Sequence, residues 1–510
     1  MHYIVNRDEM TSMEKRTIEN MGIPQILLME RAALAVFDCI TLSFEKESSV
    51  LVVAGNGNNG GDGLATARLL KLAGYRVDII LACKEGKKSE GFLKQFEILD
   101  KMGVSFFDEF DQIKNNKYDV VIDAIFGIGL NRKVSGDYFD AIGEINNMRA
   151  CVVAIDVPSG LDVDTGKALG VSVKADKTVT MAYMKQGFLM NDAAYYTGKI
   201  TVADIGILPY TAEAEPIKLF AFDKKDIKEY MPIRIKDSHK GTYGKIGIIA
   251  GSKNMAGAAI FAATAAYRMG AGIVRVFTEE CNREIIQMKL PEAVLTTYEP
   301  GDEVGIIESL DELMEWADVL LVGPGIGINS CSYLICEHVF SSYDKKLIID
   351  ADGLNILSQH PFIIENHKSK IIITPHLMEM SRLIDRDVAW IKEHKYEVAT
   401  EVANKFDVTV VLKDANTYVA SAYDPSVYIN VSGNDGMATG GSGDALAGMI
   451  AALAANTESA LLHRSAMLGC YLHGICGDRA AFVKGKHSML ATDIINHISN
   501  VLCEGDYYVD

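Results

Sequence analysis

The sequence lacks the features that mark secreted, zinc-bound and membrane proteins. Its nine cysteines are an odd number with no CxxC pair, which argues against a disulfide framework and a structural zinc site. The N-terminal residues lack the apolar core of a signal peptide. No run of about 18 apolar residues is free of charges or turn residues. We therefore expect a cytoplasmic protein that enters no membrane.

Positive charge is also scarce. Lys and Arg number 50 against 68 Asp and Glu, so the formal net charge is −18, and no basic patch stands out. A chain this acidic repels a phosphate backbone, so we expect no nucleic-acid partner. Hydrophobic residues make up 49 % of the chain and charged residues 23 %, as in globular proteins, and 510 residues suffice for two or three domains.

Short β-rich apolar runs alternate with helical segments in both halves, which predicts an α/β protein built from parallel βαβ units. The alternation breaks over a charged stretch with Pro209, Pro216 and Pro232, so we place a domain boundary near 215–230. The expected strands are 50–54, 77–82, 120–124, 152–155, 177–181 and 199–203 in the first half, and 245–250, 273–277, 319–322, 347–350, 370–374 and 409–413 in the second, with a hairpin of 417–420 and 427–431. A long helix over 26–41 precedes the first strand, and the C-terminal segment is expected to be helical.

A glycine-rich turn follows the first expected strand. Gly55, Gly57 and Gly60 match the GxGxxG pattern, in which glycines let a phosphate approach the backbone and the next helix supplies free N–H groups. The NAD-binding pattern also needs an acidic residue at the end of the second strand, where this chain has Cys83-Lys84. The asparagines crowded into the turn favour a binding site over a plain tight turn or an ordinary NAD site.

Two further strand ends of the first half carry polar side chains. Asp123 closes one expected strand, and Ser159 follows the next. Because ligands bind at the carboxyl ends of parallel strands, we expect Asn59, Asp123 and Ser159 to converge there as oxygen ligands of a hard cation. Taken singly, Asp123 fits a helix-capping carboxylate equally well, and Ser159 fits a turn hydroxyl.

The segments GNGNNGGDG, DAIFGIGL and DVPSGLD together resemble the N-terminal YjeF domain, the NAD(P)H-hydrate epimerase family, over about residues 1–215. The resemblance implies a Rossmann-like three-layer domain, which we assign to 1–218. It implies that Asn59, Asp123 and Ser159 hold a potassium ion, and that Asp156 is catalytic and faces the nicotinamide ring. The residues implied for substrate binding, besides Asp156, are Asn58, Asn59, Gly60, Gly61, Asp62, Gly127, Ile128, Gly129, Leu130, Asn131, Arg132 and Lys133.

This chemistry suits a carboxylate. The hydrate carries a hydroxyl on ring carbon 6, next to the ring nitrogen, whose lone pair can expel the hydroxyl or open the ring. Inversion of that carbon therefore needs mainly proton transfers. Asp156 can act as acid and base if its surroundings hold its pKa near the working pH.

The second half has its clearest motif in NDGMATGGSGDALAGMIAALAA, residues 434–455. A loop of small residues leads into an Ala-rich helix, so backbone N–H groups and the helix dipole form an anion site. Asp444 stands beside this loop, where it can take a proton from a substrate hydroxyl during phosphoryl transfer. The alternative is a carboxylate that only stabilises the helix start. A P-loop NTPase is excluded because no GxxxxGK[ST] pattern occurs.

GGSGD resembles the GxGD signature of the ribokinase-like superfamily. With the opening segment 240–276 and the motifs VGPGIG, DADGLN, TPH and KDANT, the second half resembles the C-terminal YjeF domain, the NAD(P)H-hydrate dehydratase family, over about residues 225–500. We therefore assign a ribokinase-like domain to 219–510. The resemblance implies that Asp444 is the catalytic base and contacts the substrate, that Ala258, Gly325 and His376 line the hydrate pocket, and that Lys413, Asp414, Ala415, Asn416, Thr417 and Gly443 hold the nucleotide.

Four details stay open at this point. His376 fits a helix-capping histidine equally well. Asp414 stands where the family usually has glycine, which places an acidic side chain near the phosphates. Asp350 and Asp352 fit residues that orient magnesium-bound water or cap a helix, and we prefer capping for Asp352. The Ala- and Gly-rich stretch 256–272 is expected to be a helix packed tightly on the sheet.

The two resemblances imply a bifunctional nicotinamide-nucleotide repair enzyme. Its first half would epimerise the R and S forms of NADHX and NADPHX. Its second half would dehydrate the S form with ADP and Mg²⁺, giving AMP and phosphate. We also expect a homo-oligomer. Two alternatives remain: a ribokinase-like kinase of a small vitamin or sugar with a Rossmann-like accessory domain, and a first half that serves only as a binding or scaffolding module.

Overall fold

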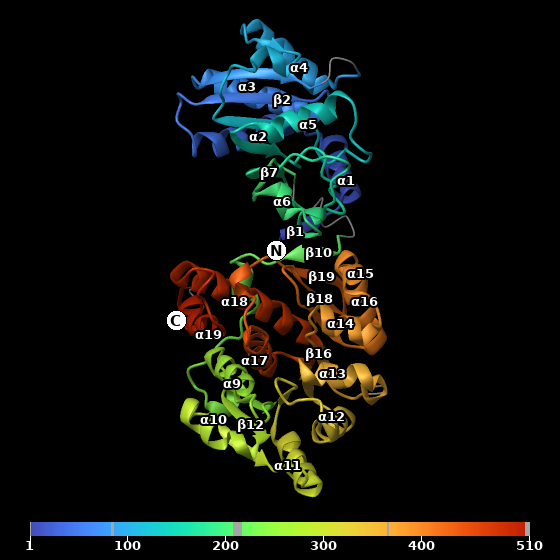
Figure 1. Cartoon of the computed structure of the whole chain (residues 1–510), viewed down its shortest axis with the longest axis vertical. Helices are drawn as coiled ribbons and strands as arrows, with labels where there is room; N and C mark the ends of the chain where they lie inside the picture. Colours follow the sequence, from blue (N-terminus) through green and yellow to red (C-terminus); the bar gives the residue numbers. More distant parts are fainter. Residues whose placement is uncertain (1, 83–85, 208–216, 365–366, 505–510) are drawn as a thin grey trace. The chain divides into compact units, whose positions relative to one another are not determined.

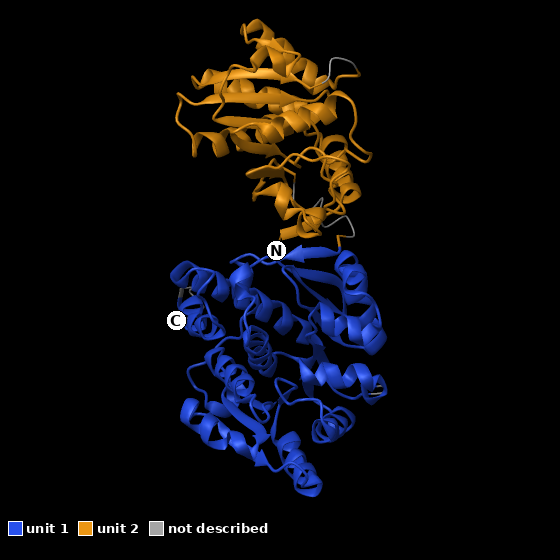
Figure 2. Ribbon diagram, in the orientation of Figure 1, with its two compact units in different colours: residues 1, 218–510 blue, residues 2–217 orange. Residues whose placement is uncertain are grey.

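The computed structural model describes residues 2–82, 86–207, 217–364 and 367–504. Cys83 and Lys84, which bear on the NAD-binding pattern, and the prolines Pro209 and Pro216 lie outside these ranges. Packing divides the chain into two compact units, His2–Ile217 and the chain from Lys218 onward (Figure 2). No helix within the described ranges is long and apolar enough to cross a membrane.

The first unit is built on a parallel sheet with the strand order β4-β3-β2-β5-β6-β7-β9 (Figure 1). Its strands are β2 (Ser49–Ala54), β3 (Arg76–Leu81), β4 (Phe106–Phe107), β5 (Val120–Ala124), β6 (Cys151–Ile155), β7 (Lys177–Met181) and β9 (Lys199–Ala203). The main helices are α1 (Arg7–Glu19), α2 (Gln25–Thr41), α3 (Asn58–Leu72), α4 (Glu90–Lys101) and α5 (Asp137–Asn147), with a short α6 (Ala194–Thr197).

Both faces of this sheet are apolar, which makes the unit three-layered. On one face of β2, Val50 and Val52 join a buried cluster with residues of α1, α2, α3 and α4. On the other face, Leu51 and Val53 join a cluster with residues of α5. Because side chains alternate along a strand, a continuous apolar run such as SVLVVA needs a helical layer on each side. The expected three-layer α/β architecture is confirmed.

A short N-terminal strand was absent from the sequence prediction. β1 (His2–Val5) pairs in parallel with β8 (Met184–Lys185), and Val5 lies opposite Lys185. α1 follows at once and begins with a capping box, in which the Asn6 side chain and the Glu9 carboxylate each accept a backbone N–H bond. The N-terminal segment is thus fixed to the strand that carries Lys185.

The second unit contains a larger sheet with the order β13-β12-β11-β14-β15-β16-β17-β18-β19-β10. Its pairings are parallel except those of β18 with β17 and of β18 with β19, which are antiparallel. β18 and β19 form the expected hairpin. The strands are β10 (Leu219–Ala221), β11 (Lys245–Ile249), β12 (Ile273–Glu279), β13 (Val294–Tyr298), β14 (Val319–Val322), β15 (Lys346–Ile349), β16 (Lys370–Ile373), β17 (Thr409–Leu412), β18 (Thr417–Ser421) and β19 (Asp424–Asn430). The helices are α8 (Asp226–Tyr230), α9 (Ala256–Arg268), α10 (Arg283–Lys289), α11 (Glu303–Trp316), α12 (Ser330–Ser342), α13 (Asp352–Gln359), α14 (Leu377–Ile384), α15 (Val388–Glu393), α16 (Lys395–Phe406), α17 (Ser442–Ala455), α18 (Leu462–Lys484) and α19 (Ala491–Glu504).

Small residues bring α9 and α17 into close contact. A Cβ atom on Gly448 of α17 would lie 2.1 Å from the Ala262 carbonyl oxygen of α9. Ala259, Ala263 and Ala266 of α9 are fully buried. The Ala- and Gly-rich stretch is therefore a tightly packed helix, as expected, and it fixes the start of α17, where Asp444 lies.

Candidate active sites

A cavity of about 630 Å³ opens at the carboxyl ends of the first unit's strands. The turn after β2, the segment after β5 and the end of β6 all reach it, as the parallel topology predicts. Of the predicted site residues, Asn58, Asn59, Asp62, Gly127, Ile128, Gly129, Leu130, Asn131, Arg132 and Asp156 line it.

The glycines of the GxGxxG turn serve mainly to bring backbone segments together. A Cβ on Gly60 would lie 1.7 Å from the Gly55 carbonyl oxygen, and one on Gly55 would lie 2.2 Å from the Ile125 carbonyl oxygen. Gly57 has no atom within 4 Å of its Cβ position and lines the cavity. Gly60 and its neighbour Gly61 are buried. The motif therefore shapes the floor of the cavity and leaves one glycine facing open space.

Asp156 follows β6 in the left-handed region, with φ of +64°. A non-glycine residue in that conformation stores backbone strain, which is common at functional sites. Its Oδ1 lies 3.0 Å from Lys185 Nζ and accepts a hydrogen bond from the Met181 N–H at 3.2 Å. The buried Lys185 ammonium also donates to Thr180 Oγ1 at 2.9 Å and to the Met181 carbonyl oxygen at 2.7 Å. These bonds hold the Asp156 carboxylate in one orientation.

The predicted cation ligands form a buried cluster beside the cavity. Ser159 donates from Oγ to Asp123 Oδ1 at 2.6 Å and from its backbone N–H to Oδ2 at 2.7 Å. Asn59 lies beside Gly127, whose Cβ position is 3.3 Å from Asn59 Oδ1, and the N–H of the preceding Phe126 donates to Ser159 Oγ at 2.8 Å. Burial raises the pKa of Asp123 to about 6, and the hydrogen bonds from Ser159 act against this rise.

This cluster fits a hard monovalent cation. Its carboxylate is fully buried, and the hydrogen-bond donors found for it among the described residues are a hydroxyl and backbone N–H groups. A buried carboxylate without a basic partner is costly unless a cation compensates it. Carboxylate, hydroxyl and amide oxygens are hard donors that suit such an ion. The residues present therefore fit the potassium ion that the resemblance implies.

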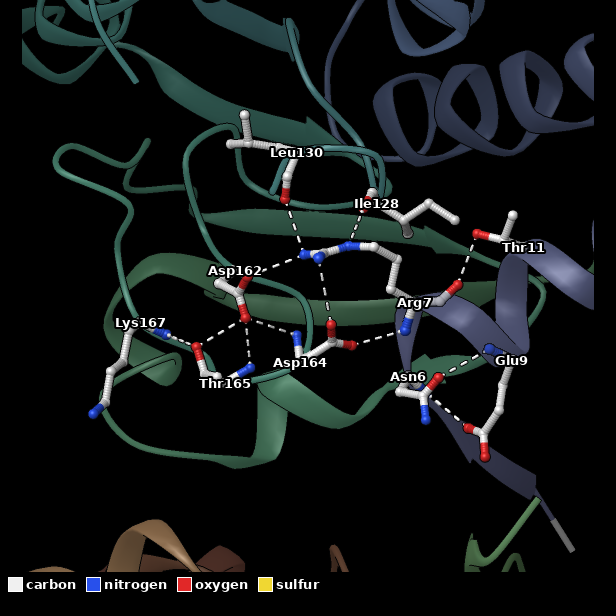
Figure 3. Close-up of polar contacts among 10 residues, drawn as sticks. All are labelled: Asn6, Arg7, Glu9, Thr11, Ile128, Leu130, Asp162, Asp164, Thr165 and Lys167. Carbon is white, nitrogen blue, oxygen red and sulfur yellow. Dashed lines mark hydrogen bonds and ion pairs between the residues drawn. The ribbon is translucent and has the colours of Figure 1, made fainter. Parts of the chain in front are cut away.

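Arg7 at the start of α1 clamps the segment after β5 (Figure 3). Its Nε donates to the Ile128 carbonyl oxygen at 2.8 Å, and its Nη2 donates to the Leu130 carbonyl oxygen at 2.9 Å. Nη2 also lies 3.0 Å from Asp162 Oδ2, and the Arg7 backbone N–H donates to Asp164 Oδ1 at 2.7 Å. The guanidinium thus fixes a stretch of predicted substrate-binding backbone, a role that sequence reasoning missed.

Several other cavity residues were also missed. Met10, Thr11 and Glu14 come from α1, Gln25 and Leu28 come from α2, and Lys185 comes from β8. The pattern of strand ends held no signal for them, since they lie outside the motifs. Lys133, by contrast, was predicted at the site, but its exposed side chain runs along Gly170, with Cγ 3.0 Å from that residue's Cβ position.

The second unit places Asp444 in the first turn of α17, next to the loop of small residues. The N-cap is Gly441 at φ +91°, and a Cβ there would lie 2.5 Å from the Phe261 ring. The N–H groups of the first helical turn have no partner within the helix, so they form a site for an anion. Burial, with the charge of Asp350 next, raises the pKa of Asp444 to about 6, and Lys413 acts against this rise.

Lys413 lies between Gly443, also predicted to hold the nucleotide, and Asp350 of the DADGLN motif. Its Nζ donates to Asp350 Oδ1 at 2.7 Å, and the same oxygen accepts the Thr374 hydroxyl at 2.7 Å. The Cβ position of Gly443 lies 3.5 Å from this Nζ. Burial raises the pKa of the nearby Glu379 to about 7, against the charge of Lys413. Lys413 and Gly443, both predicted to hold the nucleotide, are therefore neighbours.

His376 is the N-cap of α14, the alternative left open by the sequence. Its Nδ1 accepts the backbone N–H groups of Met378 and Glu379, each at 3.1 Å. Its side chain is 51 % exposed, and its Nε2 lies 3.3 Å from Glu379 Oε1. The preferred capping role for Asp352 is wrong: Ala351 is the N-cap of α13, and Asp352 instead accepts the Gly327 N–H at 2.9 Å.

The charge of Asp414, which stands where the family usually has glycine, is compensated by a lysine. Asp414 Oδ2 lies 2.9 Å from Nζ of Lys395, whose side chain is only 4 % exposed. Lys395 begins α16, and its Nζ also lies 5.1 Å from the centre of the Tyr418 ring. The extra carboxylate therefore does not stand as an uncompensated charge beside the predicted nucleotide loop.

Ala258 and Gly325, predicted to line the hydrate pocket, meet each other. Gly325 has φ of +63°, and its Cβ position lies 2.9 Å from Ala258 Cβ. The Ser252 hydroxyl donates to the Gly325 carbonyl oxygen at 2.9 Å. The start of α9 and the VGPGIG loop are thus in direct contact.

Two family models match this chain. Residues 246–500 match the model described as NAD(P)H-hydrate dehydratase. Residues 25–187 match the model described as the YjeF-related protein N-terminus. The two matches fall in the two structural units in the order that the motifs predicted.

Curated relatives and a solved structure agree with this. The chain is 34 % identical to the bifunctional NAD(P)H-hydrate repair enzyme Nnr of Moorella thermoacetica, over 98 % of this chain and 96 % of that protein. It is 32 % identical to the protein of the same name from Escherichia coli, over 98 % and 94 %. The ADP/ATP-dependent NAD(P)H-hydrate dehydratase of Bacillus subtilis superposes with a TM-score of 0.50 at 28 % identity, over 56 % of this chain and 98 % of that one.

A ribokinase-like superfamily protein of Enterococcus faecalis superposes with a TM-score of 0.51 at 29 % identity, over 57 % of this chain and 96 % of that one. The expected ribokinase-like fold of the second unit is therefore confirmed.

Proposed function

The chain belongs to the family of bifunctional NAD(P)H-hydrate repair enzymes, and from this premise we propose how its two units divide the work. The first unit epimerises the R and S hydrates of NADH and NADPH. The second unit dehydrates the S hydrate with ADP, giving AMP, phosphate and the reduced nucleotide. The observation that carries this assignment is the pair of carboxylates, Asp156 and Asp444, each set beside glycine-rich backbone at strand ends of its own unit.

In the first unit, the cavity binds the hydrate along the predicted residues. Gly57 and the segment Gly127–Arg132 offer backbone groups to the phosphates and sugar, and Arg7 holds that segment in place. Asp156, oriented by Lys185, exchanges a proton with the hydroxyl on ring carbon 6 or with the water that replaces it.

Asn59, Asp123 and Ser159 would hold a potassium ion, which would supply a fixed positive charge at the strand ends. The support for this site is the fully buried Asp123 carboxylate described above. That charge would offset the cost of burying the carboxylate and would hold the turn after β2 against the segment after β5.

In the second unit, Asp444 takes the proton from the ring hydroxyl, and the hydroxyl oxygen attacks the terminal phosphorus of ADP. AMP leaves, and carbon 6 of the nicotinamide ring now carries a phosphate ester. The ring nitrogen lone pair expels this phosphate, and loss of a proton from carbon 5 restores the dihydronicotinamide double bond. Lys413 and the first-turn N–H groups of α17, including that of Gly443, stabilise the phosphate charge, and Mg²⁺ arrives on the nucleotide.

The raised pKa of Asp444 supports its role as the base. A carboxylate with a pKa of about 6 is ionised at neutral pH, yet it holds a proton more strongly than an ordinary aspartate. Ala258, Gly325 and the exposed edge of His376 form the wall against the nicotinamide. A homo-oligomer and a cytoplasmic location stay predictions.

The test is an assay of the intact chain with a mixture of R and S hydrates, ADP and Mg²⁺. Recovery of reduced nicotinamide must be complete, and AMP and free phosphate must form in equal amounts. Asp444→Asn is expected to abolish recovery, and Asp156→Asn is expected to stop it once the S form is consumed. A stable phosphorylated product without reduced nicotinamide would instead identify a small-molecule kinase. ATP in place of ADP tests the nucleotide preference.

A further inference from the structure

The α1 helix supplies a wall of the first unit's cavity that no family motif covers, since the family-model match begins at residue 25. Along α1, Met10 and Glu14 are one helical turn apart, and both line the cavity with Asp156 and Lys185. We propose that the Glu14 carboxyl is the second acid–base group of the epimerase site and works as the partner of Asp156. This inference rests on the proposed epimerase function.

Inversion at a ring carbon requires a group in addition to Asp156. When the hydroxyl leaves one face of the ring, it needs a proton so that it departs as water. When water returns to the opposite face, it must lose a proton to a base. A single carboxylate fixed in one orientation, as Asp156 is by Lys185 and the Met181 N–H, serves one face.

The Glu14 carboxyl gives its proton to the hydroxyl oxygen, and the C6–O bond breaks as the ring nitrogen lone pair forms a C=N bond. Water then adds to C6 from the other face, the C=N electrons return to nitrogen, and the Asp156 carboxylate takes the released proton. The next turnover in the reverse direction, or exchange with solvent, restores both groups.

The surroundings of Glu14 strengthen its hold on a proton, which suits a group that acts as the acid. Burial raises the pKa of Glu14, and the charge of Asp156 raises it further, whereas Lys185 and a hydrogen bond from Gln25 act against the rise. The pKa of Asp62, also on the cavity wall, is raised by burial and by the charges of Asp156 and Glu14. Burial and the neighbouring negative charges therefore act in the same direction on Glu14 and Asp62 and strengthen the hold of each carboxyl on its proton.

The helix that carries Glu14 is held to the rest of the unit by contacts that precede Glu14 in the chain. β1 pairs with the strand that carries Lys185, and Arg7 bonds to the carbonyl groups of Ile128 and Leu130. Met13, next to Glu14, is fully buried in the main core of the unit. The helix therefore presents Glu14 to the cavity from a defined position, which acid–base catalysis requires.

The experiment measures interconversion of the purified S hydrate into the R hydrate by the full chain, without nucleotide, by chromatography. Spontaneous epimerisation is subtracted. Glu14→Gln is compared with Glu14→Asp and with Glu19→Gln, a change at an exposed position on the same helix. The dehydratase rate of each sample with ADP and Mg²⁺ reports whether the chain is folded.

We expect Glu14→Gln to lower the epimerase kcat by about 100-fold, the lower range for loss of a general acid, with little change in KM. In the wild type, the rate falls as pH rises through the pKa of Glu14, because the acid form is lost. This fall is absent in Glu14→Gln and retained in Glu14→Asp. Glu19→Gln behaves as the wild type.

Two results would overturn the proposal. One is an epimerase rate of Glu14→Gln equal to that of Glu19→Gln. The other is an alkaline fall that persists in Glu14→Gln and disappears in Asp62→Asn, which would assign the acid to Asp62. A wild-type chain that does not exceed the spontaneous rate would refute the proposed epimerase function itself, a result distinct from both.

Discussion

The pH dependence of dehydration tests the role of Asp444 most directly. The base must be ionised, and the pKa of Asp444 is raised from 3.8 to about 6, chiefly by burial. The rate should therefore rise with pH and reach half its plateau at about pH 6. At pH 5 only about one tenth of a group with that pKa is ionised, against more than nine tenths of an ordinary aspartate, so the two cases differ by roughly tenfold in rate.

A change at Lys413 moves this profile in a known direction. Its positive charge lowers the pKa of Asp444, so Lys413→Met should shift the half-maximal pH upward. Because Lys413 is also predicted to bind the nucleotide, kcat must be measured at saturating ADP, apart from KM. Asp444→Asn should lower kcat by about 100-fold or more. The rate that remains in this variant should no longer decrease as the pH is lowered through about 6.

The assay follows phosphate release from the S hydrate between about pH 4.5 and 8, and a blank without enzyme corrects for decay of the nucleotides in acid. The dehydrating base is not Asp444 if the wild-type rate stays on its plateau down to pH 5. The same conclusion follows if the rate of Asp444→Asn still decreases as the pH is lowered through about 6. An upward shift in Lys413→Met that vanishes when Asp444 is replaced would place the two groups in one titrating pair.

Three further changes test the geometry around the two sites. Arg7→Lys should raise the epimerase KM by about 3- to 10-fold, because losing one hydrogen bond to the substrate segment costs roughly 0.5–1.5 kcal/mol, while the dehydratase KM of the same chain stays constant. Lys395→Met should raise the KM for ADP by about tenfold, because it leaves Asp414 charged and unpaired. Adding Asp414→Gly to this change should restore the original KM. Equal KM values for the single and the double variant would contradict the pairing of Lys395 with Asp414. Asp123→Asn should abolish any activation of the epimerase by K⁺ over Na⁺ without changing dehydration, whereas a response to K⁺ that survives the change would place the ion elsewhere.

Parallel topology explains why much of the site could be predicted. Once β2, β5 and β6 are recognised as parallel neighbours, their carboxyl ends must meet at one edge, which brings Asn59, Asp123 and Asp156 together. The same reasoning places Asp350 near Lys413, because β15 and β17 both border β16. The strand positions were also predictable, since buried parallel strands are continuous apolar runs.

Short and irregular strands held weaker signals. β1, β4, β8 and β10 have two to four residues each, too few to show a period. β13 reads VLTTY and has a largely half-buried pattern, which did not stand out from a loop. Because β1 and β8 were missed, so was the placement of Lys185 beside Asp156.

Contacts between distant segments were beyond the reach of sequence patterns. Glu14 sits on a helix that carries none of the recognised motifs, and only the packing of α1 turns it toward the cavity. Likewise, Asp414 was recognised as a departure, but nothing in the sequence paired it with Lys395, which lies 19 positions away on another element. Such pairs depend on side-chain directions that only the folded chain fixes.

The surroundings of the two carboxylates proposed as catalytic differ, and the difference suits the two reactions. In the first unit, Lys185 contacts Asp156 directly, and burial together with the charge of Asp156 raises the pKa of the Glu14 carboxyl on α1. In the second unit, Lys413 donates its hydrogen bond to Asp350 and lowers the pKa of Asp444 only through its charge. Burial is therefore the largest influence on the pKa of Asp444. Epimerisation needs an acid and a base together, and two carboxyl groups on one cavity can serve it. Phosphoryl transfer needs one base strong enough to accept a proton from an alcohol, and a single aspartate with a raised pKa meets that need.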